Sequence, residues 1–165
     1  MFYLGEQKFV PIGYGTYMAT PGFDWYQTGH EGLKLLIAYL LALPVGWWRE
    51  KEGHGIGVRT FPLVAVASCG YVLLGMAPGL NTVDAQSRIV QGVVTGIGFI
   101  GGGAILKSEG GVHGTATAAS IWTTGVLGAA VAQERYLIAV VLAVLNLVTL
   151  RLLLPLKQKL DSESR

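Results

Sequence analysis

Long stretches without charged residues, each of a length that can cross a lipid bilayer, dominate this sequence. Lys, Arg, Asp and Glu are clustered, and five mainly apolar stretches separate the clusters, at about residues 33–48, 60–83, 89–106, 110–133 and 136–156. The first carries Lys34 and the last carries Arg151, whereas the other three have no charged residue. A spanning helix needs about 20 mostly apolar residues. We therefore predict an all-α polytopic membrane protein, a bundle of about five transmembrane helices joined by short connections.

The composition agrees with this class and excludes others. Only 13% of the residues are charged, whereas about 25% is usual in a globular domain, and the net charge of +2 is too small to indicate nucleic-acid binding. The single cysteine, Cys69, lies in an apolar stretch and cannot form an intramolecular disulfide. We divide the chain into an irregular leader (1–32), a transmembrane domain (33–156) and a short polar tail (157–165). The leader has no apolar segment typical of a secretory signal.

The distribution of Lys and Arg predicts the orientation in the membrane. With the amino terminus outside, eight of these residues fall inside and four outside, the outer four being Lys8, Lys34, Arg88 and Arg135. Positive residues are enriched on the cytoplasmic side of membrane proteins. We therefore expect the amino terminus outside and the carboxyl terminus in the cytoplasm, with the lipid bilayer as the principal environment.

The third apolar stretch contains a glycine-rich string. Residues 96–101 match the pattern G-x-G-x-x-G, but a dinucleotide site also needs a preceding strand and a later acidic residue, and this string lies within an uncharged stretch. Two small-x-x-x-small pairs favour helix packing instead: Gly92 with Gly96, and Gly98 with Gly102. We predict that Gly98 and Gly102 lie where another helix crosses at close range. Five glycines in eight residues also weaken a helix, so a kink or break is the alternative.

Hydroxyl residues follow one face of the fourth stretch. Thr117, Ser120 and Thr124 recur at helical spacing, with Gly128 on the same face. One interpretation is that the hydroxyls bond carbonyls of their own helix while small residues pack against neighbouring helices. The other is a polar wall along a permeation path, which Gln91, Thr95 and Asn146 could join. We favour the first.

Charged residues at the predicted helix ends are the remaining candidates for function. They can turn inward and pair, and they are Arg49, Glu50, Arg59, Asp84 and Arg88. Asp84 and Arg88 are suited to an i,i+4 pair, and we expect Glu50 and Arg59 to form a bond that supports the inner membrane edge. No group of residues has the spacing of a metal site or combines a nucleophile with a base, so we predict no cofactor and no enzymatic activity.

Several consecutive strings resemble the MgtC/SapB family. The first-loop signature is similar to residues 46–50 (GWWRE) and 57–60 (GVRT), the third helix to 88–92 (RIVQG) and 96–103 (GIGFIGGG), and the start of the fourth helix to 110–122 (GGVHGTATAASIW). The resemblance covers residues 32–156 in the order and spacing of the family. There are departures: Trp48 stands at a usual Glu, Phe61 at a usual His, His113 at a usual Arg and Ala116 at a usual Thr. Longer members also carry a soluble carboxyl-terminal domain.

The resemblance implies a bacterial inner-membrane protein linked to growth at low magnesium. Members of the family are regarded mainly as regulators of other membrane proteins. Two hypotheses follow: a regulator that binds partner membrane proteins or itself through its glycine-rich helices, or an oligomeric channel or transporter for a cation such as magnesium. We favour the regulator, because ionisable groups within a membrane usually mark transport paths and are scarce here.

Overall fold

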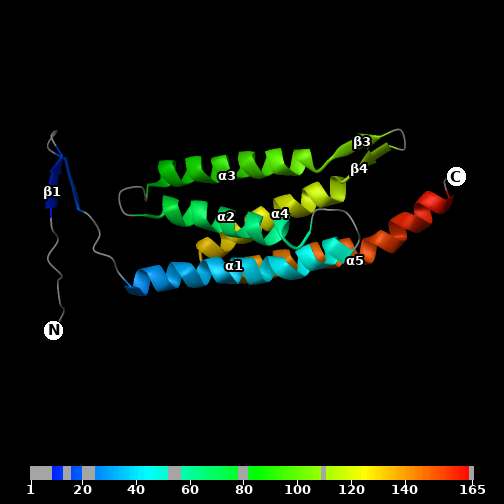
Figure 1. Cartoon of the computed structure of the whole chain (residues 1–165), viewed down its shortest axis with the longest axis horizontal. Coiled ribbons are helices and arrows are strands. Elements are labelled where there is room, and N and C mark those ends of the chain that lie inside the picture. Colours follow the sequence, from blue (N-terminus) through cyan, green and yellow to red (C-terminus); the bar gives the residue numbers. More distant parts are fainter. Residues whose placement is uncertain are drawn as a thin grey trace.

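The computed structural model of the chain describes residues 9–12, 16–19, 25–51, 57–77, 82–108 and 111–163. These ranges contain five helices: α1 (Trp25–Lys51), α2 (Thr60–Gly75), α3 (Val83–Gly103), α4 (Thr115–Ala132) and α5 (Tyr136–Glu163). They also contain two antiparallel hairpins, β1 (Phe9–Ile12) with β2 (Thr16–Ala19), and β3 (Leu106–Ser108) with β4 (Gly111–His113). Figure 1 shows the helices side by side, with the two hairpins toward opposite ends of the bundle. The prediction of an all-α bundle with five helices is confirmed.

The bundle has the exterior of a membrane protein. Among the described residues, α1, α4 and residues 136–153 of α5 are long and apolar enough to span a bilayer, and α2 is a shorter apolar helix. Large apolar side chains cover the outside, as at Leu63 and Leu74 of α2 and at Leu137 and Leu152 of α5. In a bilayer these side chains face lipid, so their exposure is favourable.

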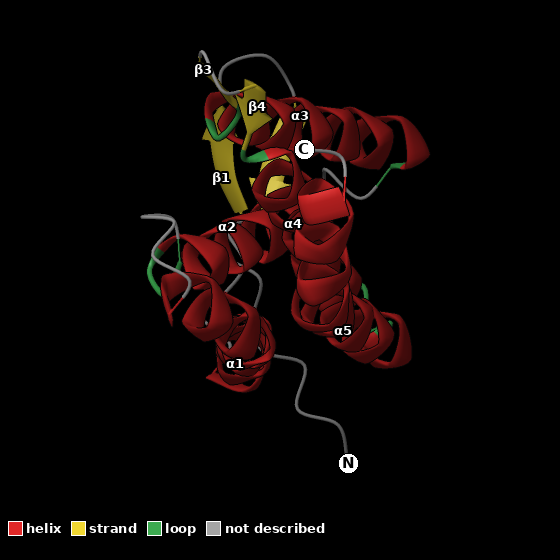
Figure 2. Ribbon diagram, turned by 90° about the vertical axis from the view of Figure 1, so that its right-hand side faces the viewer, coloured by secondary structure: helices red, strands yellow, loops and turns green. Residues whose placement is uncertain are grey.

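The centre of the bundle is formed by α2 and α4, as the end-on view in Figure 2 also indicates. Phe61 of α2 and Ile121 and Leu127 of α4 are almost completely buried. Gly128 allows this close approach, because a Cβ at its position would lie within about 3.0 Å of the Ala65 Cα. In contrast, α3 packs against the rest of the bundle with one of its sides, which contacts α4 and α2. It therefore lies at the edge of the bundle.

The amino-terminal part of the chain differs from the prediction in two respects. The first helix begins at Trp25, not at residue 33, and the leader that we expected to be irregular contains the hairpin of β1 and β2. The first turns of α1 are polar and include a Gln27–Glu31 side-chain hydrogen bond of 3.1 Å. The hydropathy of the sequence locates only the apolar part of a helix, so it missed this extension. The rest of the leader lies outside the described residues.

The glycine-rich helix is continuous. α3 runs from Val83 to Gly103 and ends at Ala104, whose N–H bonds the carbonyl of Gly101 at 3.1 Å. The break that the glycines allow as an alternative is therefore absent from α3. The chain then enters the hairpin of β3 and β4, in which Lys107 pairs with Val112. Gly114 starts α4 in a left-handed conformation, with a φ of 84°, which glycine adopts at no steric cost.

Candidate functional site

A buried arginine connects α1 and α4 at the end of the bundle that we expect to be cytoplasmic. Arg49 lies in the last turn of α1 with only 4% of its surface exposed, and its Nη2 donates a hydrogen bond to the Thr117 hydroxyl of α4. A cation in the last turn also interacts favourably with the helix dipole. The two residues were separate candidates in the sequence, and the structure brings them together. Arg49 thus ties the end of α1 to the start of α4.

Glu50 stabilises the loop that leads into α2. Its carboxylate accepts a hydrogen bond of 3.1 Å from the backbone N–H of Val58, and Gly57 packs directly against it. Any Cβ at Gly57 would collide with the Glu50 backbone, so only glycine fits there. Arg59 begins α2 with an exposed side chain. Within the described residues Glu50 and Arg59 form no ion pair with each other, so the edge is held by the Glu50 side chain and the Val58 backbone.

The hydroxyl face of α4 is used for contacts inside the protein. The Ser120 hydroxyl donates to the Asn146 Oδ1 of α5 at 2.6 Å, and the Asn146 amide donates to the Ser120 carbonyl at 3.1 Å and the Thr124 hydroxyl at 3.3 Å. Thr124 also donates to the carbonyl of Ser120, four residues earlier, at 2.8 Å. All three side chains are buried. This supports the interpretation of helix packing over that of a polar wall along a path.

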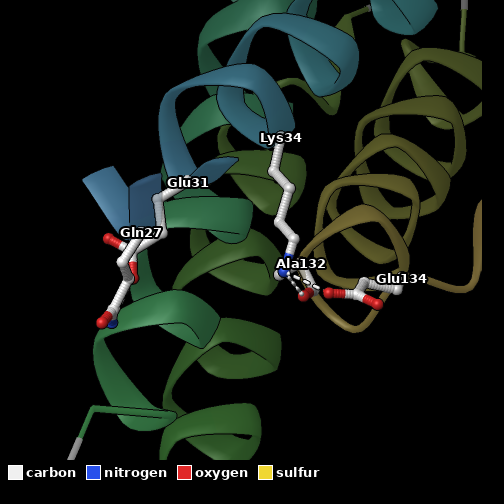
Figure 3. A network of polar contacts seen from close by, with 5 residues as sticks. All are labelled: Gln27, Glu31, Lys34, Ala132 and Glu134. Carbon is white, nitrogen blue, oxygen red and sulfur yellow. Dashed lines mark hydrogen bonds and ion pairs between the residues drawn. The ribbon is translucent and has the colours of Figure 1, made fainter. Parts of the chain in front are cut away.

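An ion pair that no spacing in the sequence predicts lies at the opposite end of the bundle. The Lys34 ammonium is 2.8 Å from the Glu134 carboxylate and 3.4 Å from the Ala132 carbonyl (Figure 3). Lys34 is 6% exposed, and Glu134 occupies the turn between α4 and α5. The hydrogen bond and the charge of Lys34 lower the pKa of Glu134. A lysine in an apolar stretch was the available signal, since such a charge usually has a partner.

Glu134 also has an unusual backbone conformation. Its φ of 59° is left-handed, and glycine is the residue usually found at this position of a helix end. The backbone N–H of Glu134 bonds the Val131 carbonyl at 3.0 Å, and that of Arg135 bonds the Ala130 carbonyl at 2.9 Å. These are the two bonds of a Schellman motif. Glu134 thus has a strained backbone conformation at the position from which its side chain reaches Lys34.

The pair of Asp84 and Arg88 has the predicted geometry. Their side chains are 3.0 Å apart at i,i+4 spacing, and both are largely exposed at the start of α3. An exposed pair of this kind contributes little to stability. The pair therefore lies on the surface of α3 and does not join α3 to another helix.

The glycines of α3 do not mark a close helix crossing within the chain. A Cβ added at Gly92, Gly96, Gly98 or Gly102 would meet nothing within 4 Å. Gly92 and Gly96 instead line a groove of about 550 Å³ between α2 and α3. The prediction for Gly98 and Gly102 is wrong in this respect, because α3 presents its other side, with Ile97 and Gly101, to the bundle. The close approach is made at Gly101, where a Cβ would lie 3.4 Å from the Ala118 carbonyl.

A polytopic membrane protein with an apolar exterior and a hydrogen-bonded core is the class that this fold and site define. The MgtC family matches residues 35–159. Protein SrpB of Synechococcus elongatus is 39% identical over 67% of this chain and 66% of its own length. The "Putative magnesium transporter YhiD" of Escherichia coli K12 is 32% identical over 72% of this chain and 58% of its own length. The chain belongs to the MgtC family.

Protein MgtC of Salmonella typhimurium is a further relative, 35% identical over 58% of this chain and 40% of its own length. The chain thus spans from 40% to 66% of the length of these three relatives. No solved structure gives a significant match.

Proposed function

We propose that this chain is a small bacterial inner-membrane protein that regulates other membrane proteins and supports growth at low magnesium. Its amino terminus lies outside and its carboxyl terminus in the cytoplasm, and it catalyses no reaction. The connection with magnesium is supported by the name of one relative, "Putative magnesium transporter YhiD", and by membership of a family that the resemblance links to growth at low magnesium. The family and the apolar exterior support the membrane location.

The observation that carries the regulatory role is the use of the buried polar groups. Ser120, Thr124 and Asn146 bond one another, and Thr117 bonds Arg49, so the polar side chains in the interior hold helices together. Ion paths in membrane proteins are lined by oxygen ligands that an ion can reach. The buried oxygens of this protein already form hydrogen bonds between helices and are not open to an ion. This suits a protein that acts by binding other proteins.

The alternative is an oligomeric channel or transporter for a cation such as magnesium. The observation that favours it is the polar side of α3, where Gln91 and Thr95 are exposed. Several copies could place these side chains around a common axis. A break in the glycine-rich helix would free carbonyl oxygens as a second source of ligands for a cation. α3 does not supply them, because it is continuous.

Flux measurements on the full chain in liposomes distinguish the two functions. Indicators for magnesium and protons are enclosed, and empty liposomes and liposomes with an ionophore give the lower and upper references. We expect the rate of empty liposomes, together with rescue of low-magnesium growth when the chain is expressed in a strain that lacks it. Magnesium flux well above the empty liposomes would favour the transporter instead.

A further inference from the structure

One face of α3 has a composition that is unusual for a surface in lipid. Ile97 and Gly101 are buried against the bundle, and about a third of a turn away around the helix lies a row of exposed residues at alternating spacings of four and three. We call these the outer face of α3: Asp84, Arg88, Gln91, Thr95, Gly98 and Gly102. All six are exposed, and both views place α3 at the edge of the bundle (Figures 1 and 2).

The outer face is polar where a lipid-facing surface should be apolar. The exposed side of α5 shows the normal pattern, with Leu137, Leu145 and Leu152. Gln91 lies near the middle of the 21 residues of α3, and its carboxamide makes no hydrogen bond among the described residues. An amide in hydrocarbon without a partner is costly. This surface therefore suits contact with protein.

The same face is smooth enough for another helix to approach. Gly98 and Gly102 lie one turn apart, and the space in front of both is open. The Thr95 hydroxyl is turned back to the Gln91 carbonyl at 2.8 Å. Small residues at this spacing allow the backbones of two helices to come close, which drives association in membranes.

We propose that the outer face of α3 binds the outer face of α3 in a second copy of this chain. Two copies inserted in the same orientation are related by a twofold axis along the membrane normal, so each residue meets its counterpart. A carboxamide both donates and accepts, so two Gln91 side chains satisfy each other. Asp84 and Arg88 carry opposite charges one helical turn apart, so Asp84 of one copy can pair diagonally with Arg88 of the other. The face is thus self-complementary in its amide and in its charges.

The inference goes beyond the proposed function. A dimer through α3 can be a regulator or part of a transporter, and its failure would leave the flux and growth results as they are. In a dimeric regulator, other membrane proteins would bind to surfaces outside α3.

Cysteine cross-linking in membranes tests the contact. In full-length protein with Cys69→Ala, we would introduce Gln91→Cys or Gly98→Cys on the outer face. The matched controls are Val90→Cys and Ile100→Cys, which are also exposed on α3, 38% and 46%, but point elsewhere. We expect a disulfide-linked dimer from the first pair and not from the second. Equal cross-linking of all four, no dimer from the outer face, or its capture by a different protein would overturn the proposal.

The glutamine gives a second measurement. Energy transfer between labelled copies in vesicles reports their association, which we expect Gln91→Leu to weaken about three- to tenfold, while Gln91→Asn retains part of it. Gln91 is exposed, so neither variant removes a buried side chain from the fold. Unchanged association of Gln91→Leu would contradict the role of the paired amides.

Discussion

Thr117 receives a hydrogen bond from a buried cation, which makes its hydroxyl more important than its size. Thr117→Val keeps the shape of the side chain but leaves the Arg49 guanidinium without this acceptor. We expect a loss of about 1–3 kcal/mol in the free energy of unfolding, because hydrogen bonds to charged groups are the stronger ones. Thr117→Ser retains the hydroxyl and serves as the control. The measurement is unfolding in mixed detergent micelles. Equal stability of the Val and Ser variants would show that the bond contributes nothing.

The contact between Lys34 and Glu134 predicts a dependence on pH. Because Lys34 lowers the pKa of Glu134, the ion pair stabilises the fold above the pKa of an unfolded glutamate, about 4.3. That contribution is lost as the pH falls through the lower pKa of the folded state. We expect the parent to melt at a higher temperature than Glu134→Gln at pH 7 and the difference to shrink toward pH 3. A constant difference would mean that the carboxylate charge is not its source.

Contacts between residues that are close in the sequence were predictable, and distant ones were not. Asp84 and Arg88 were predicted to pair because four residues make one turn of a helix, and the structure confirms it. Arg49 and Thr117 were each candidates, but they lie 68 positions apart, and no spacing rule relates them. The sequence shows Lys34 only as a charge in the first apolar stretch. Its partner depends on how the turn after α4 folds over α1.

The glycines of two helices serve opposite purposes, which a matched pair of substitutions can test. Gly128 of α4 lies against the Ala65 backbone, whereas Gly98 of α3 has open space in front of it. Gly128→Ala should cost about 1–3 kcal/mol through overpacking. Gly98→Ala should be neutral or stabilising in dilute detergent, where copies are separate, since alanine favours a helix by about 0.5–1 kcal/mol. The check is the unfolding of both variants in the same micelles. Equal losses would show that α3 packs more tightly than the structure indicates.

The number of helices and their order could be predicted because charge-free stretches of spanning length leave few alternatives. The packing face of α3 could not be predicted from the glycine spacing alone, because Gly98 and Gly102 fit a contact within the chain or with another chain equally well. The row of Ile89, Val93 and Ile97 marks the side that α3 turns to its neighbours. This row is spaced for one helix face and was available in the sequence. The apolar spacing is therefore a better guide than the glycine spacing to the side of α3 that packs against the bundle.

At the scale of the whole molecule, the orientation in the membrane is the main prediction. Five helices place the two ends of the transmembrane domain on opposite sides, and the Lys and Arg distribution puts the carboxyl terminus inside. A reporter active only in the cytoplasm should therefore be active when fused after Arg165. The control is a reporter that is active only after export, fused at the same position. Activity of the exported reporter would overturn the orientation.

The short second helix has a consequence for the membrane around the protein. α2 has 16 residues, a length of about 24 Å, which is less than the hydrocarbon thickness of about 30 Å, and its Leu63 and Leu74 face outward. Lipids beside α2 must compress to cover it, at a cost for each ångström of mismatch. We therefore expect the protein to be more stable in bilayers of shorter acyl chains, which unfolding in vesicles of graded chain length would measure. The stability of the protein thus depends on the thickness of the membrane that surrounds α2.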